Sequence, residues 1–246
     1  PQWDGVYRQG HAMWMLQQYG GLYKGERCFI VGTGPSLALI PTRLQEALAD
    51  EYTLGCNLIA KTNLPFVPTM LALMVSEWHW VNDKGLDWMV KTVQSTRKEL
   101  PPLRFYAHER AQKWLDDRDW QYVRCHEGVR VEMNEFYGLG TNMRCVAFGY
   151  SVILMAVQLA CWMGFDPIYL LGCDGTSQGH AYKETKELDA RGDQSYFHRC
   201  AAVAEARMKL DGRTLIDLTE NGTLPVTKGR LEDVIGMSSY SQKVIR

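Results

Sequence analysis

The sequence predicts an α/β fold in which a doubly wound, mainly parallel sheet carries helices on both faces. Two apolar runs, 28–31 and 167–171, are short and rich in β-branched or aromatic residues, as buried strands are. Each run passes directly into a glycine-containing turn. Stretches with helical spacing alternate with further short apolar runs, which is the pattern of a parallel sheet. The 246 residues suit one large domain of this kind, or one domain with a small appendage.

The first half of the chain is expected to supply most of the strands. Leu44 and Leu48 lie one helical turn apart, and Pro101-Pro102 stops a later helical stretch. In chain order we expect a helix over 42–49, strands over 52–57 and 68–75, a helix over 83–100, a strand over 103–107, a helix over 109–115 and a strand over 120–125.

The second half is expected to hold the core helix and two long loops. We expect a loop or lid over 126–148, a helix over 152–163, a strand that ends at 174, a loop or lid over 175–193, a helix over 194–210, a strand over 214–218 and a helix over 230–235. The predicted organisation is an N-terminal helical and aromatic extension over 1–24 and a single domain over 25–246.

Composition narrows the classes of function. The net charge is −1, so we expect no general attraction to nucleic acid or to an anionic membrane. The seven cysteines form no Cys-x-x-Cys pair, which argues against a zinc site. An odd number of cysteines without a disulfide framework favours a reducing, cytoplasmic location. No signal peptide is visible, and the sequence leaves a homo-oligomer open.

One segment is long enough to cross a membrane. Residues 145–165 carry no charge, but Gly149-Tyr150-Ser151 indicates a loop or helix start inside them. The remaining helix of ~12 residues would reach only ~18 Å. We therefore predict a buried core helix and no transmembrane span.

The two strand ends carry glycine and polar residues. The first strand is followed by Gly32, Thr33, Gly34, Pro35 and Ser36, and the later one ends on Asp174 and Gly175. Ligands of open α/β sheets bind at such ends, where backbone N–H groups can meet phosphate, so we expect one shared crevice. The pattern is neither the dinucleotide fingerprint nor a P-loop, and a tight turn without a ligand is the alternative. Asp174 alone does not make a metal site.

Three further residues could serve chemistry beside this crevice. His180 and His198 follow Asp174, and a neutral imidazole at His198 could act as a general base. The alternative is a surface or helix-capping histidine. Tyr182 could donate a hydrogen bond to phosphate, or it could only pack half-buried.

Three stretches resemble one superfamily of transferases. They are Lys-Gly-Glu-Arg-Cys-Phe-Ile-Val-Gly-Thr-Gly-Pro-Ser-Leu at 24–37, Leu-Gly-Cys-Asn at 54–57, and an Ala-rich helix, Gly-Phe, strand and Gly-Cys-Asp over 156–174. The sequence is similar to the superfamily of bacterial sialyltransferases, motility-associated flagellin glycosyltransferases and MptE-like 6-hydroxymethylpterin diphosphokinases. The resemblance spans residues 24 to about 236, with a poorly matched middle.

The resemblance implies a Rossmann-like domain that binds a nucleotide donor. It implies that Gly32, Thr33, Gly34 and Ser36 line the phosphate and ribose, that Asn57 contacts the nucleotide and that Ser151 lies near the base or phosphate. Two roles in catalysis also follow from it, a tyrosine at Tyr182 that steadies the departing phosphate and a general base at His198. Thr33 replaces an asparagine of the family, and Thr176 stands where a second phosphate-binding tyrosine would be.

The function expected is that of a metal-independent glycosyltransferase of the sialyltransferase-like class. Its substrates would be a CMP-sugar donor and a small-molecule or glycan acceptor, and no cofactor would be required. One alternative is a pterin diphosphokinase that uses ATP and magnesium, with Asp174 helping to hold the metal. The other is a catalytically inactive nucleotide-binding domain, in which Thr33 and Thr176 mark a lost site.

Overall fold

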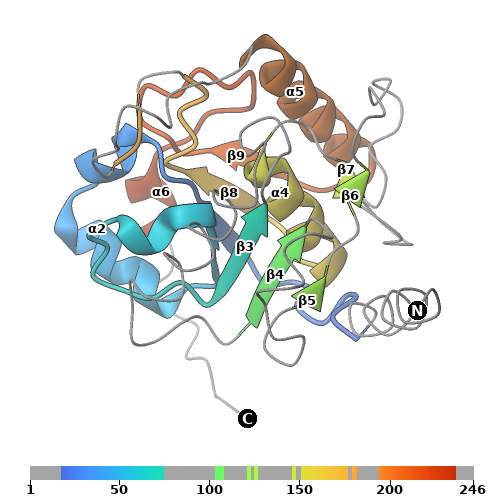
Figure 1. The fold of residues 1–246 in the computed structure, drawn as a ribbon, viewed down its shortest axis with the longest axis horizontal. Helices are drawn as coiled ribbons and strands as arrows, with labels where there is room; N and C mark the ends of the chain where they lie inside the picture. The colour runs from blue at the N-terminus through green and yellow to red at the C-terminus, as the bar shows by residue number, and fades with distance from the viewer. Residues whose placement is uncertain are drawn as a thin grey trace, which may run out of the picture.

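The computed structural model describes residues 18–74, 103–107, 121–122, 125–126, 146–147, 151–176, 179–181 and 194–236. These residues form a sheet of seven strands in which every neighbouring pair is parallel (Figure 1). The strands are β1 (Cys28–Val31), β2 (Thr53–Cys56), β3 (Met70–Met74), β4 (Leu103–Ala107), β5 (Gln121–Tyr122), β8 (Ile168–Leu171) and β9 (Leu215–Asp217). The predicted Rossmann-like α/β fold is confirmed.

The order of the strands places β1 at the switch point of the sheet. The order is β5-β4-β3-β2-β1-β8-β9, so the chain builds outward from β1 on one side and later returns to add β8 and β9 on the other. Val31 is paired with Leu171, so β1 and β8 end level with one another. The turns that follow these two strands therefore leave the sheet side by side at its carboxyl edge, where α/β proteins bind ligands.

Helices cover both faces of the sheet. The α-helices are α2 (Thr42–Ala47), α4 (Val152–Met163), α5 (Gln194–Leu210) and α6 (Leu231–Gly236), and the 3-10 helices are η1 (Pro35–Leu39), η2 (Leu48–Asp50) and η3 (Asn57–Lys61). α4 and α5 have the predicted bounds. α4 and α5 pack on one face, and α2 and α6 on the other (Figure 1).

The expected strand over 120–125 is wrong as a single element. Tyr122 pairs with β4, whereas Cys125 belongs to β6 (Cys125–His126), which pairs with β7 (Val146–Ala147) in a separate sheet. The expected loop over 126–148 consequently includes β7. An apolar pattern indicates that residues are extended, but it does not indicate which strand they pair with. The pattern therefore could not show that this stretch contributes to two different sheets. The helices expected over 83–100 and 109–115 lie outside the described residues.

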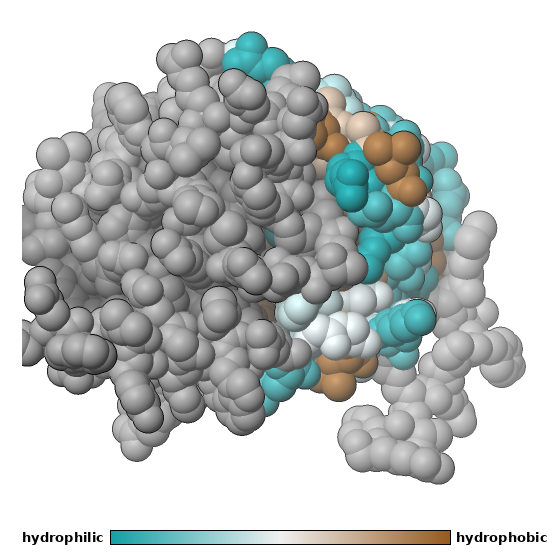
Figure 2. Space-filling model, turned by 90° about the vertical axis from the view of Figure 1, so that its right-hand side faces the viewer, coloured by the Kyte–Doolittle hydropathy of each residue, from teal (hydrophilic) through white to brown (hydrophobic). Residues whose placement is uncertain are grey.

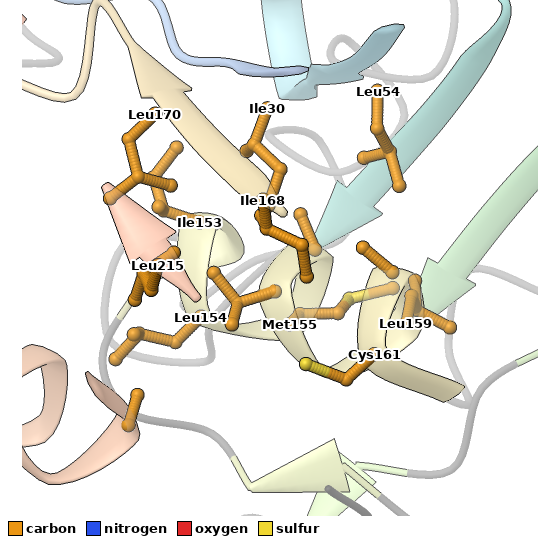
Figure 3. Close-up of a cluster of buried hydrophobic side chains, with 14 of the residues drawn as sticks. Ile30, Leu54, Ile153, Leu154, Met155, Leu159, Cys161, Ile168, Leu170 and Leu215 are labelled. Atoms are coloured by element: carbon orange, nitrogen blue, oxygen red, sulfur yellow. The ribbon is translucent and has the colours of Figure 1, made fainter. Parts of the chain in front are cut away.

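Alternation along β1 divides the core into two layers. Cys28 and Ile30 face α4, whereas Phe29 and Val31 face the opposite layer with α2 and α6. Figure 3 shows Ile30 with side chains of β2, β8 and β9 directed toward α4. Strands buried on both faces read as continuous apolar runs, which is why the sequence made these strands visible.

Helix α4 is enclosed by protein. Ten of its 12 residues are buried, and Gln158 among them donates to the Leu154 carbonyl of the same helix at 2.9 Å. Ser151 caps its N-terminus, and Gly164 ends it in the left-handed conformation at φ +95°. The prediction of a buried core helix over 152–163 is confirmed. Among the described residues, no helix combines the length and apolar character that a membrane span requires.

The segment over 18–26 closes the C-terminal end of α4. The N–H groups of Gly21 and Tyr23 donate to the carbonyls of Trp162 and Met163, and Tyr23 stacks on Phe165 with ring centroids 4.6 Å apart. The division of the chain at residue 24 stays a prediction. On the face seen in Figure 2, the described residues are mainly hydrophilic, with apolar residues in small separate groups.

Candidate functional site

The turns after β1 and β8 are packed directly against each other. The N–H groups of Gly32 and Gly34 donate to the carbonyls of Leu171 and Gly172, both at 2.8 Å. A Cβ atom at Gly32 would lie 2.4 Å from the Gly172 oxygen, and one at Gly34 would lie 1.8 Å from Asp174 Oδ2. The glycines are therefore required because the two turns approach so closely, whether or not a ligand binds.

Asp174, in the turn after β8, contacts the β1 turn through both of its carboxylate oxygens. Oδ1 accepts the Ser36 backbone N–H at 3.1 Å, and Oδ2 accepts the Ser36 hydroxyl at 2.8 Å. Ser36 is buried and Asp174 is half-buried, so these bonds are partly shielded from water. The N–H groups of Gly32, Gly34 and Ser36 thus have acceptors within the protein. The expectation that they are free to meet phosphate is wrong in this arrangement.

Thr33 connects the β1 turn to residues 179–181. Its carbonyl accepts the Ala181 N–H at 2.7 Å, and its hydroxyl lies 2.8 Å from Nδ1 of His180. The sequence placed His180 near the crevice, and the structure places its ring on the hydroxyl of Thr33. Thr33 is half-buried. Its hydroxyl is therefore a partly exposed polar group beside the switch point of the sheet.

His198 reaches the same region from α5. Its Nε2 lies 2.7 Å from the Gly175 carbonyl oxygen and 3.3 Å from Oγ1 of Thr223. Thr223 also donates its N–H to the Asp174 carbonyl at 2.9 Å. The two ends of the predicted site, Asp174 on the sheet edge and His198 on a helix, therefore meet through Gly175 and Thr223.

The other predicted residues lie around this centre to differing extents. Asn57 follows β2 at the same edge and has φ +47°, a left-handed conformation that asparagine tolerates. Ser151 accepts the Ile153 N–H at 3.2 Å, so its hydroxyl oxygen caps its own helix, and its place near a base or phosphate stays a prediction. Thr176 directly follows Gly175 and is half-buried. Tyr182 lies outside the described residues.

A buried carboxylate that sequence reasoning missed stands at the end of β9. Asp217 is fully buried; Oδ1 accepts the Thr219 N–H at 2.9 Å, and Oδ2 pairs with the Lys228 ammonium. The Thr219 hydroxyl in turn accepts the Cys173 N–H at 3.1 Å. This network fixes the loop that carries Thr223 beside the β8 turn.

Thr223 and Asp217 gave no local signal in the sequence. Thr223 lies 49 residues from Asp174 in an ordinary polar loop, and Asp217 ends a strand of three residues. Only the tertiary contacts reveal what they do.

The thiols of the sheet are buried: Cys173 and Cys56 follow or end strands at the carboxyl edge, and Cys28 begins β1 at the opposite edge. Burial raises the pKa of Cys173 well above its usual range, and also raises the pKa of Cys28 and Cys56. Within the described ranges, no group of three or more histidine, cysteine or acidic side chains is arranged to hold a metal ion.

Comparison with known proteins gives one informative likeness. No family model matches the sequence, and no curated protein matches it. The structure resembles that of the MAf glycosyltransferase from Magnetospirillum magneticum AMB-1, with a TM-score of 0.52 and 11% sequence identity. The likeness covers 91% of this chain and 38% of that one, so the chain spans well under half the length of that protein. At this identity the likeness establishes a shared fold.

Proposed function

We propose that the chain is a nucleotide-dependent glycosyltransferase that transfers a sugar from a CMP-sugar to an acceptor hydroxyl without a metal ion. The observation that carries the proposal is the contact between the β1 and β8 turns at the switch point of the parallel sheet. Thr33 and Asp174 lie at this edge, and His198 is hydrogen-bonded to the Gly175 carbonyl. Open α/β sheets bind nucleotides at this position.

The fold supports the class of reaction. A glycosyltransferase shares it over 91% of this chain, and the motifs at 24–37, 54–57 and 156–174 resemble a superfamily that includes such enzymes. The chain matches only part of that larger protein, so the acceptor and any further domain belong to the proposal. We expect the chain to act in the cytoplasm.

The chemistry needs a base on one side and phosphate stabilisation on the other. His198 would take the proton of the acceptor hydroxyl, whose oxygen then attacks the anomeric carbon of the sugar. The bond from that carbon to the phosphate oxygen breaks, and CMP leaves with the electron pair. The developing charge lies on one phosphate, which the hydroxyls of Thr33, Thr176 and Tyr182 can stabilise.

In the β1 turn, the side chain of Thr33 would make the main contact with the donor. Since Asp174 already occupies the N–H and hydroxyl of Ser36, Gly32, Gly34 and Ser36 would shape the donor site more than bind its phosphate. Asn57, which ends the neighbouring strand, would contact the nucleoside. Ser151, whose hydroxyl oxygen caps α4, would lie near the base or phosphate.

Calorimetry tests the choice of donor and the need for metal. We expect CMP and CMP-sugars to bind equally well with EDTA and with magnesium, and more tightly than ATP. Tight binding of ATP only with magnesium would favour the pterin diphosphokinase instead. Failure of every nucleotide to bind would leave an inactive domain.

Substitution of the base separates catalysis from binding. His198→Ala should leave the Kd for CMP nearly unchanged. It should lower the rate at which CMP is released from a bound CMP-sugar by ~10²-fold or more. Leu210→Ser, at the exposed end of the same helix, is the matched control and should retain full turnover. Equal loss of CMP binding and turnover in His198→Ala would contradict the role of a base.

A further inference from the structure

The ring of His198 is held by two oxygen atoms at the same nitrogen. The Gly175 carbonyl oxygen lies 2.7 Å from Nε2, and the Thr223 hydroxyl oxygen lies 3.3 Å from it. A carbonyl oxygen can only accept a hydrogen bond, so Nε2 must carry the proton in the shorter of the two contacts.

We propose that Gly175 is the positioning residue that fixes the tautomer of His198, so that Nδ1 is the atom that accepts the proton of the acceptor hydroxyl. This inference rests on the proposed function of His198 as a base. A neutral imidazole has one N–H, and a proton held at Nε2 leaves the lone pair on Nδ1. Among the described residues, Nδ1 of His198 makes no hydrogen bond, so it is the nitrogen left for a substrate.

The backbone at Gly175 explains why this residue is a glycine. Its φ of +66° lies in the left-handed region, which residues with a Cβ atom rarely adopt. A Cβ atom there would lie 2.8 Å from Cδ2 of Leu224 and 3.0 Å from Nε2 of His198. Leu224 is buried, so a side chain at Gly175 would displace the packed leucine or the imidazole itself.

Thr223 fixes the position of the Gly175 carbonyl that contacts His198. Its N–H donates to the Asp174 carbonyl at 2.9 Å, and its hydroxyl lies 3.0 Å from the carbonyl oxygens of both Asp174 and Gly175. The single hydroxyl proton can go to either carbonyl, and the hydroxyl oxygen faces Nε2 of His198. The residues of this arrangement come from two loops and one helix that are far apart along the chain.

The tautomer is measured directly on the full chain. Long-range ¹H–¹⁵N spectra of protein labelled at histidine distinguish Nε2–H from Nδ1–H imidazoles, and His198→Gln identifies the signal by its loss. We expect the neutral His198 ring to be the Nε2–H form. A neutral ring in the Nδ1–H form would overturn the proposal, whether or not the chain is active.

Kinetics then test the consequence for catalysis. Gly175→Ala should lower kcat for CMP release on the order of 10-fold or more and leave KM for the CMP-sugar within ~3-fold, because the displaced imidazole acts on the acceptor hydroxyl and not on binding of the donor. Thr223→Ser keeps the hydroxyl and should keep both the Nε2–H signal and kcat, whereas Thr223→Val should weaken both.

The two proposals fail in distinguishable ways. If CMP and CMP-sugars do not bind, the proposed function fails while the Nε2–H signal still reports the position of the ring. If His198→Ala loses turnover but a folded Gly175→Ala keeps full kcat, the positioning role of Gly175 is wrong and the proposed function stands. If Gly175→Ala does not fold, equal kcat and spectra in Thr223→Val and Thr223→Ser would overturn the part played by Thr223, and the wild-type spectrum still decides the tautomer.

Discussion

Asp174 and Ser36 are joined by two hydrogen bonds across the two strand-end turns, although they lie 138 residues apart in the chain. The carboxylate uses one oxygen for the Ser36 N–H and the other for its hydroxyl. A glycine-rich turn that suggests phosphate binding is thus already occupied by the protein's own anion. Asp174 consequently serves to hold the β1 and β8 turns together, and under the proposed function the donor phosphate should contact side chains around them.

The coupling between Asp174 and Ser36 is measurable. Asp174→Asn and Ser36→Ala should each lower the free energy of unfolding by about 1–3 kcal/mol, because each removes a partner from a partly buried, charge-assisted hydrogen-bonded pair. The double variant should show a coupling of about 0.5–3 kcal/mol in urea denaturation. Asp211→Asn, which breaks an exposed helix pair, is the control and should change stability by less than about 1 kcal/mol. Additive effects of the first two substitutions would mean that the pair contributes nothing.

Gly34→Ala should be strongly destabilising for steric reasons alone. Gly34 has φ −65°, so alanine meets no backbone strain there, but its Cβ would lie 1.8 Å from Asp174 Oδ2 and 2.7 Å from the Gly172 oxygen. We expect a loss of about 2 kcal/mol or more in urea denaturation. Gly212→Ala has the opposite character, with open space but φ +71°, and should cost only about 1–2 kcal/mol. A larger loss at Gly212 than at Gly34 would contradict this packing.

The free energy of unfolding should depend on the Cys161 thiol at alkaline pH. Burial raises the pKa of Cys161 to about 12, so the folded chain keeps this proton after the unfolded chain, with a thiol pKa of about 8.5, has lost it. Because the unfolded state then binds fewer protons, stability falls as pH rises above about 8.5.

Cys161→Ala isolates this effect. The variant lacks the thiol, so the excess stability of the wild type over it should shrink by about 1–2 kcal/mol between about pH 7.5 and about pH 10 in urea denaturation. Cys200→Ala, at a half-buried position, should show a smaller change. A difference for Cys161→Ala that stays constant with pH would exclude the expected linkage.

Lys228 should matter more than an exposed lysine normally does. Its partner Asp217 is fully buried, so Lys228→Met leaves a buried carboxylate with the Thr219 N–H but without its cation. The ammonium is half-exposed, which limits the expected loss to about 1–3 kcal/mol in thermal or urea unfolding. Arg230→Met, whose ion pair with Glu232 joins two exposed side chains, should cost at most about 1 kcal/mol. Equal losses in the two variants would show that burial of Asp217 adds nothing.

Part of this protein follows from its sequence alone. The bounds of α4 agree because local signals set them: a serine at the N-cap, an uncharged and mainly apolar run and a glycine at the C-terminal end. β1 and β8 were visible because both faces of each strand are buried, and their side-by-side turns follow from the rules of parallel sheets. These rules do not indicate which strand pairs with residues 120–125. The sequence therefore could not predict that this stretch is divided between two sheets.

The contacts within the site depended on the tertiary structure. The glycines of the β1 turn predicted free N–H groups, but the fold brings a carboxylate from β8 onto them, and no local pattern records that partner. Asp217 and Thr223 act through residues in other strands, loops and helices, so their roles exist only once the sheet edge is assembled. The same holds for His198: its position on a helix was predictable, but the carbonyl that fixes its proton comes from a turn 23 residues earlier. Short-range periodicity determines where elements begin and end, whereas the partners of polar groups are chosen by long-range packing.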